Sequence, residues 1–172
     1  MKNTKKLIAL ILAALAAFAM LAACGGGEGG GEGGGAAVKG ETQTWGNLTV
    51  FVPEGYALTG GSLLNKEDPD ALQIYLETSP LHAFTVSVTD DEEEADGSLT
   101  ATKEMNDANG AEGDVTFTAG GVTWTGYAYK YGNDDCFIAY GEVSGKWVLV
   151  SGGYSAYNSD EATAVLESIK VK

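Results

Sequence analysis

The sequence predicts a single α+β domain: a mainly antiparallel, curved β-sheet of about six to seven strands with one or two helices packed on it. Between residues 45 and 154, apolar side chains recur mostly at every second position, which is the period of a half-buried strand. Short links rich in Gly, Asn and Asp separate these runs, and links of this kind join antiparallel neighbours. The last apolar run, after residue 158, instead has helical spacing.

Three strands are expected in the first half of the domain. Apolar and polar side chains alternate most clearly over 84–89. Pro53 ends the first strand because proline has no N–H to offer a sheet, and it opens a Pro-Glu-Gly turn into a short run at 56–58. The segment 79–82, Ser-Pro-Leu-His, is expected to be a tight connection. The expected strands are 47–52, 72–77 and 84–89.

A solvated acidic loop and a helix are expected next. The acidic run at 90–96 lacks the alternation and central glycine of an EF-hand loop, so it predicts a loop rather than a calcium site. A thin apolar stripe predicts a helix over 99–108, which Asn109-Gly110 would end. Four further strands are expected at 114–119, 122–131, 136–143 and 146–154.

A second helix closes the chain. Asn158 or Ser159 is its expected N-cap, and the acids Asp160 and Glu161 suit the positive end of the helix dipole. An apolar stripe at i, i+3, i+4, i+7 spacing should dock this helix on the sheet. The stripe consists of Ala162, Val165, Leu166 and Ile169.

Residues 1–23 resemble the signal peptide of a bacterial lipoprotein. Three lysines precede an uncharged run at 7–23, as in the basic and apolar regions of an export signal. The run leads into Leu21-Ala22-Ala23-Cys24, which is similar to a lipobox. The resemblance implies that the Cys24 thiol receives a diacylglycerol, that the signal is cleaved, and that Cys24 anchors the chain at the outer face of the cell membrane.

The alternative is an uncleaved membrane-spanning anchor. The run at 7–23 is shorter than the ~20 residues of a typical spanning helix, and its commonest residue is the weakly hydrophobic alanine. Glycine and glutamate, rather than lysine, follow it directly. Both interpretations leave the rest of the chain outside the cytoplasmic membrane, because the positive charges lie on the N-terminal flank.

Residues 24–40 predict a flexible tether between Cys24 and the folded domain. Gly25 to Gly35 contains only glycine and glutamate, which provide no apolar side chain for a core. As a flexible coil, such a segment spans roughly 20–25 Å root-mean-square. The folded domain is expected over 41–172, which is long enough to bury a core without disulfides.

The acidic composition limits the possible partners. The formal net charge is −14, and the chain contains no arginine. Nucleic-acid binding requires a basic surface that neutralises phosphates, so no nucleic-acid partner is expected. Attraction to anionic lipids is disfavoured for the same reason, which leaves the lipid on Cys24 as the expected anchor.

Several short motifs within 41–172 resemble PsbP-like domains. Trp45 and the segment 52–56, Val-Pro-Glu-Gly-Tyr, are similar to the family's opening, in which an aromatic precedes a strand that ends in a Pro-x-Gly-aromatic turn. The hairpin at 120–124 and the end of the last helix at 169–171 are similar as well. The resemblance implies a curved antiparallel sheet with helices against it. The family includes photosystem accessory subunits, a nuclear-import factor and many exported lipoproteins, and no catalytic pattern accompanies it.

An aromatic ladder on the strand 122–131 is the main candidate binding surface. Tyr127, Tyr129 and Tyr131 fall on one face of this strand. Flat apolar rings with polar tips can stack on sugars or peptides. The alternative is that a helix covers this face. Strands favour aromatic residues, so the tyrosines do not by themselves indicate a binding surface. Neighbouring strands are expected to add Trp147, and also Tyr140 and Tyr154.

No catalytic constellation is evident. His82 is the only histidine, no Gly-x-Ser-x-Gly elbow occurs, and Cys136 beside Phe137 predicts a buried thiol rather than a nucleophile. A zinc site would need more His and Cys ligands, so no metal and no cofactor are expected. With 24 acidic residues, a carboxylate pair in a cleft could still hydrolyse a wall polymer, and this alternative remains open.

The sequence therefore favours a lipid-anchored, non-catalytic binding or accessory protein at the cell envelope. Its expected partners are the membrane, through the diacylglycerol on Cys24, and an envelope protein, a glycan or a peptide. A structural subunit of an envelope complex is a further alternative.

Replacing Cys24 by Ala should release the protein from the membrane, because the thiol that accepts the lipid is lost. Fractionation of cells that express each form measures this, with the wild-type chain as the control. A Cys24→Ala protein that remains firmly membrane-bound as a signal-cleaved species would contradict the lipid anchor.

Overall fold

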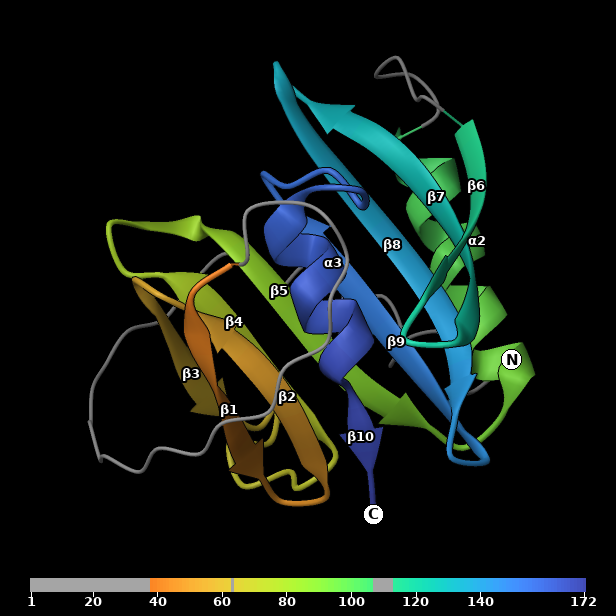
Figure 1. The fold of residues 1–172 in the computed structure, drawn as a ribbon. Coiled ribbons are helices and arrows are strands. Elements are labelled where there is room, and N and C mark those ends of the chain that lie inside the picture. The colour runs from red at the N-terminus through yellow and green to blue at the C-terminus, as the bar shows by residue number, and fades with distance from the viewer. Residues whose placement is uncertain (1–37, 63, 107–112) are drawn as a thin grey trace.

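The computed structural model describes residues 38–62, 64–106 and 113–172, which form ten strands and two helices (Figure 1). Neither helix of this described part is long and apolar enough to cross a membrane. In chain order the elements are β1 (Gly40–Trp45), β2 (Leu48–Pro53), β3 (Tyr56–Gly60), β4 (Ala71–Leu76), β5 (Ser79–Thr89), α2 (Glu92–Asn106), β6 (Gly113–Ala119), β7 (Val122–Tyr131), β8 (Asp134–Val143), β9 (Lys146–Gly153), α3 (Asp160–Ser168) and β10 (Lys170–Val171).

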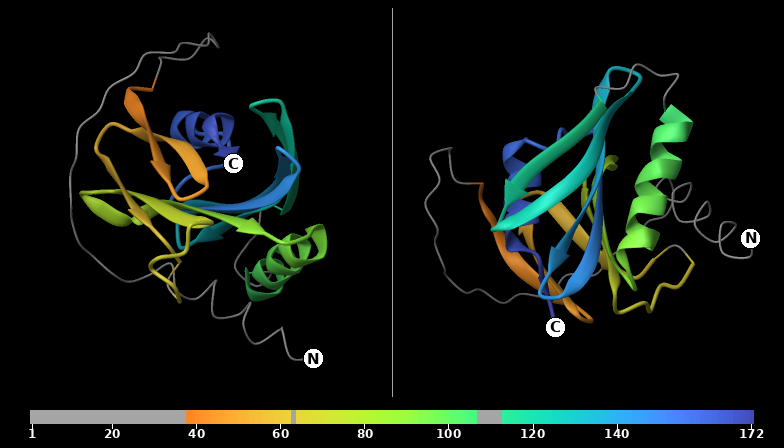
Figure 2. Two further views of the ribbon diagram at one scale, coloured as in Figure 1. Left: turned by 90° about the horizontal axis from the view of Figure 1, so that it is seen from below. Right: turned by 90° about the vertical axis from the view of Figure 1, so that its right-hand side faces the viewer.

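The strands form two antiparallel sheets. The larger has seven strands in the order β3-β4-β5-β9-β8-β7-β6, and the smaller has three in the order β1-β2-β10. The large sheet curves around α3, while α2 lies on its opposite face (Figure 2). This arrangement confirms the predicted fold class: an α+β domain with a mainly antiparallel, seven-stranded curved sheet and two packed helices.

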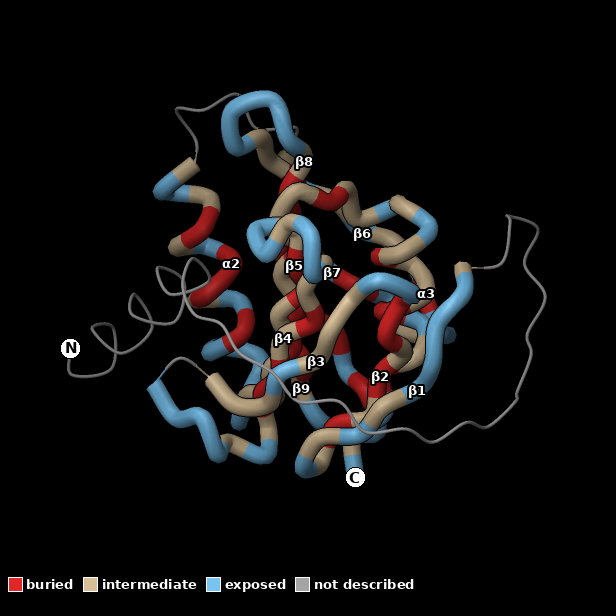
Figure 3. Tube along the Cα trace, turned by 90° about the vertical axis from the view of Figure 1, so that its left-hand side faces the viewer, coloured by how far each residue is buried: buried red, intermediate tan, exposed pale blue. Residues whose placement is uncertain are grey.

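The main core fills the space between the concave face of the large sheet, the small sheet and α3 (Figures 2 and 3). Strand alternation directs one set of side chains into it, so that Phe84, Trp124 and Phe137 have no exposed surface. The predicted stripe of α3 also faces this core, and Val165 has no exposed surface. Ser159 caps the helix as expected, since its side chain accepts a hydrogen bond from the backbone N–H of Ala162.

A smaller core lies on the other face of the large sheet, beneath α2. Ala95 and Leu99 of α2 pack there on side chains of β7 and β8. Both faces of the sheet are therefore covered over part of their area, which explains why the inner strands carry bulky apolar side chains on each side. The buried members of this core are Ala95, Leu99, Tyr127, Ile138 and Tyr140.

Two hairpin turns use the left-handed backbone conformation. At the β8–β9 turn, Ser144 and Gly145 have φ angles of 54° and 77°, and at the β6–β7 turn, Gly120 and Gly121 have φ angles of 60° and 76°. Two successive positive φ angles match the right-handed twist of the strands that they join. The two-residue hairpin predicted at 144–145 is confirmed.

The structure corrects two predictions in the first half of the domain. Segment 79–82 is not a tight connection but the start of β5, and the chain turns at residues 77–78 instead. The acidic run is not a loop throughout, because α2 begins at Glu92. Asp91 Oδ1 accepts a hydrogen bond from the backbone N–H of Glu94 (2.9 Å), and acids in a first turn interact favourably with the helix dipole. The predicted helix end at Asn109-Gly110 lies outside the described residues.

The sequence predicted one sheet, whereas the structure adds a second, small one. Its outer strand β1 is mostly polar and exposed, so its sequence lacks the alternation that marks a half-buried strand. Tertiary contacts hold the strand in place: Trp45 Nε1 donates a hydrogen bond to the carbonyl of Asp68 (2.9 Å), and all six residues of β1 pair with β2. The third strand, β10, has only two residues.

Gly152→Ala should lower the free energy of unfolding by about 1–3 kcal/mol, because an added methyl group would clash with the buried ring of Phe137 on the neighbouring strand. Gly97→Ala is the matched control. Its new methyl group meets nothing within 4 Å in α2 and should raise stability by about 0.5–1 kcal/mol. Urea denaturation measures both. A Gly152→Ala variant as stable as the wild type would contradict the close packing of Phe137 on β9.

Candidate functional site

The tyrosine ladder of β7 runs from beneath α2 to an open end of the sheet. Tyr127 is 3% exposed and stacks on Tyr129 with ring centroids 5.9 Å apart. Leu99 of α2 packs in the same cluster, and Lys103 Nζ lies 5.8 Å from the centre of the Tyr127 ring. The sequence left open whether this face binds a ligand or is covered by a helix. At Tyr127 it is covered by α2.

The structure does not bring Trp147 to the open end of the ladder. Trp147 lies near the start of β9, opposite Glu142, whereas Tyr131 ends β7 opposite Asp134, at the other end of β8. The indole packs edge-on against Tyr140 at 5.8 Å, and Tyr140 Oη donates a hydrogen bond to Asp96 of α2 (3.3 Å). These two aromatics help to attach α2 to the sheet.

A pair of tyrosines forms the exposed end of the ladder. Tyr131 is 55% exposed, and its ring centre lies 6.3 Å from that of Tyr154, which directly follows β9. Tyr154 has a φ angle of 54°, a left-handed conformation that costs a residue other than glycine roughly 1–2 kcal/mol. Such local strain is characteristic of functional positions, so this pair is the part of the ladder best suited to contact a ligand.

Sequence reasoning placed Tyr154 near the ladder only as one of three neighbours. The sequence predicted a strand over 146–154, whereas β9 ends at Gly153, so Tyr154 lies just beyond the strand and not in it. Its positive φ angle is a tertiary feature, because tyrosine has no intrinsic preference for that conformation.

Cys136 packs inside this end of the sheet and pairs across the strands with Tyr129. It is 5% exposed, which confirms the predicted buried thiol. Burial raises the pKa of the thiol, although backbone hydrogen bonds from Tyr154 and Tyr131 act in the opposite direction. A protonated, buried thiol is a poor nucleophile, so Cys136 contributes packing rather than reactivity here.

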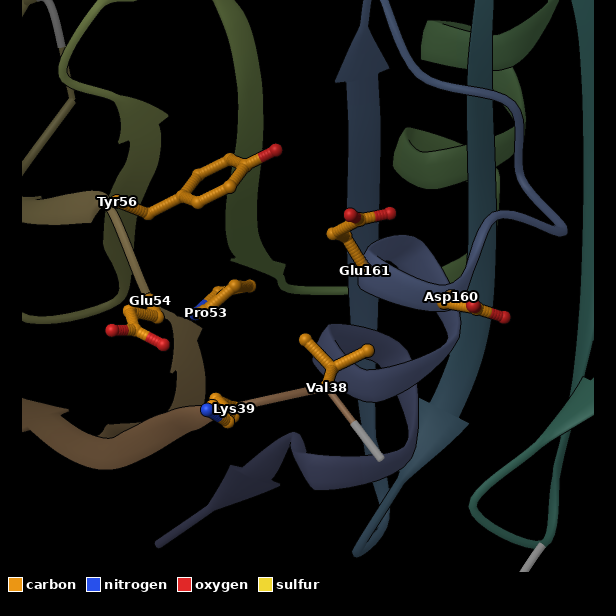
Figure 4. A pocket seen from close by; sticks show the side chains of 7 residues that line it. All are labelled: Val38, Lys39, Pro53, Glu54, Tyr56, Asp160 and Glu161. Carbon is orange, nitrogen blue, oxygen red and sulfur yellow. The ribbon is translucent and has the colours of Figure 1, made fainter. Parts of the chain in front are cut away.

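A separate pocket of about 320 Å³ lies between the β2–β3 turn and the start of α3 (Figure 4). Tyr56 and Glu161 line opposite sides of it. Burial, together with the negative charge of Glu161, raises the pKa of Tyr56 to about 12. Three carboxylates against one ammonium group make the pocket suited to cations rather than anions. Its lining residues are Val38, Lys39, Pro53, Glu54, Tyr56, Asp160 and Glu161.

His82, the only histidine, belongs to an aromatic cluster that includes Tyr56 of this pocket. Its ring packs edge-on against Tyr56 at 5.7 Å and lies 6.5 Å from Phe84. No group of three or more His, Cys, Asp or Glu side chains in the described ranges is arranged to hold a metal ion. The buried polar residues in those ranges are Ser98, Thr102 and Ser155, so they include no carboxylate whose pKa burial would raise for acid catalysis.

No family model matches the chain, and no curated protein matches it. Among solved structures, the chain is similar to cyanobacterial PsbP (CyanoP) from Synechocystis sp. PCC 6803. The TM-score is 0.48 at 13% sequence identity, over 84% of this chain and 98% of the other. CyanoP carries the family name that the motifs at residue 45 and 52–56 suggest, but a likeness of this degree assigns no activity, ligand or partner to this chain.

The stability of the domain should fall between pH 10 and about 12 as partly buried tyrosines ionise. Burial raises the pKa of Tyr129 to about 12, and electrostatic interactions with Cys136 and Tyr127 add smaller increases. The neutral phenol is thus favoured in the folded chain. The stabilisation from the neutral phenol is complete below the pKa of tyrosine in the unfolded chain, near 10. It is lost as the pH rises through the higher pKa of Tyr129 in the folded chain.

Tyr129→Phe keeps the ring but cannot ionise, so its urea midpoint should fall less steeply across this window than that of the wild type. Tyr131→Phe, at the exposed ring, is the matched control and should follow the wild-type curve. Parallel curves for Tyr129→Phe and the wild type would show that Tyr129 is not shielded from water as described.

Proposed function

We propose that this chain is a non-catalytic binding or accessory protein, held by a lipid on Cys24 at the outer face of the cell membrane. Its folded domain would contact a glycan, peptide or protein of the envelope. The lipobox-like motif 21–24 and the glycine-rich tether support the anchoring, and the acidic surface supports a partner other than nucleic acid.

The observation that carries the binding role is the tyrosine pair at the end of the large sheet. Tyr131 projects more than half of its surface into solvent next to Tyr154, although large aromatics are usually buried. Two neighbouring rings, tilted by 41° to each other, form a platform of apolar ring faces with polar hydroxyl groups, which suits the faces of sugar rings and the side chains of peptides. Strands β7 and β8 hold the platform on a rigid support.

Hydrolysis of a wall polymer by paired carboxylates has weaker support. A glycosidase acid must be protonated near neutral pH, which usually requires burial in an apolar site. Glu54, Asp160 and Glu161 line an acidic pocket, but at that pocket they face an open surface rather than an apolar cleft. Accessory binding therefore agrees better with the site chemistry.

Removing either ring of the tyrosine pair should weaken binding without unfolding the domain. Tyr154→Asn deletes one ring and places at this position a residue that tolerates the left-handed conformation, so its stability should stay within about 1 kcal/mol of the wild type. We expect Tyr154→Asn and Tyr131→Ala each to weaken binding of purified cell-wall fragments by about tenfold or more, a change of about 1.4 kcal/mol.

The matched control is Tyr75→Ala, because Tyr75 lies on β4, far along the sheet from β7. Calorimetric titration with glycan strands and with stem peptides measures binding, and thermal melting measures stability. Equal affinities for the wild type and both platform variants would contradict the proposed role of this surface. Release of sugars or peptides by the wild-type protein would instead favour the hydrolase.

A further inference from the structure

β6 (Gly113–Ala119) is an edge strand of the large sheet. β7 pairs with one side of it, and no strand of the described chain pairs with the other (Figure 2). Besides the backbone hydrogen bonds with β7, the carbonyl of Ala119 in β6 accepts a hydrogen bond from Trp124 Nε1 (3.3 Å). An edge of this kind presents free N–H and C=O groups to another strand.

The features that usually protect an edge strand are missing from β6. It contains no lysine and no proline, and its seven pairs with β7 run without a bulge. Its only charged residue, Asp114, forms an ion pair with Lys103 of α2 (2.5 Å). The edge is therefore locally close to neutral, although the chain as a whole carries a net charge of −14.

The other exposed edges are less suitable for pairing. β1 carries an exposed Glu41 near its start, and β3 has only five residues, next to the acidic turn residue Glu54. By contrast, β6 alternates exposed Asp114, Thr116 and Thr118 with half-buried Val115 and Phe117. A strand added at this edge would extend both the polar face and the apolar face of the sheet.

We propose that β6 pairs antiparallel with β6 of a second copy of this chain, about a two-fold axis through Thr116. In that register Thr116 lies opposite Thr116 of the second copy, and Val115 lies opposite Phe117. Asp114 lies opposite Thr118, so no like charges face each other. Threonine pairs and β-branched–aromatic pairs are favourable across antiparallel strands, and the contact is isologous, as a closed dimer requires.

The whole-chain charge gives the interface a characteristic salt dependence. Two acidic domains repel each other over distances that salt screens, since the Debye length is about 8 Å at physiological ionic strength. Backbone hydrogen bonds and apolar contacts at the edge are short-ranged and little affected. The dimer should therefore become more abundant as salt is raised, whereas an interface built on opposite charges would weaken.

Cysteine cross-linking of the full-length protein tests both the contact and its register. Thr116→Cys should give a covalent dimer under mild oxidation, because the two new thiols face each other across the axis. Thr118→Cys should not, because its two copies would lie roughly 14 Å apart along the strands. Asp114→Cys mixed with Thr118→Cys should cross-link as a heterodimer.

Thr125→Cys is the matched control, since Thr125 is exposed on the same face but lies on β7, one strand away from the edge. Its two copies would be three strand spacings, about 14 Å, apart. Circular dichroism checks that each variant is folded, and the wild-type chain controls for Cys24 and Cys136. If Thr116→Cys gives no more dimer than Thr125→Cys, at low and at high salt, the proposal is wrong.

Discussion

The packing of α3 and the small sheet into the concave face of the large sheet is the interaction on which the structure depends. Phe84, Trp124 and Phe137 lie fully buried there, together with Leu48 of the small sheet and Val165 of α3. Successive side chains of a strand point to opposite faces of the sheet. Because one set of side chains is buried in the concave face, the other set lies on the convex face. α2 then covers part of that face with a second, smaller core.

This division restricts where the domain can present a binding surface. The concave face is filled, and Tyr127 and Tyr140 lie beneath α2. The remaining positions are strand ends, edges and turns, which are also the parts of a fold that usually carry function. The pair Tyr131 and Tyr154 occupies one such end, and the open edge of β6 is another.

Periodicity in the sequence was sufficient to predict most of the elements that bury side chains. The four strands after residue 113, the capped helix at Ser159 and the burial of Cys136 all follow from local patterns. The polar strand β1 and the start of α2 in the acidic run could not be predicted in this way. Their positions depend on pairing with β2 and on the Asp91 cap, rather than on an apolar period.

The candidate site shows the same limit. The spacing of Tyr127, Tyr129 and Tyr131 placed them correctly on one face, but only the packing of α2 distinguishes the covered ring from the exposed one. Trp147 of β9 pairs near one end of β8, whereas Tyr131 of β7 pairs at the other end. Strand order and register decide which side chains become neighbours on adjacent strands, and the spacing along one strand does not. The strained backbone of Tyr154 has no counterpart in the sequence pattern.

The most direct test of binding at the tyrosine pair is to map the amide resonances of this protein during titration with cell-wall glycan strands and stem peptides. If the tyrosine pair binds the ligand, the shifted amides should cluster at 129–136 and 152–155, around the pair, while those of the two cores stay in place. Shifts confined to the acidic pocket at 53–56 and 160–161, or no shifts with either probe, would contradict binding at this pair.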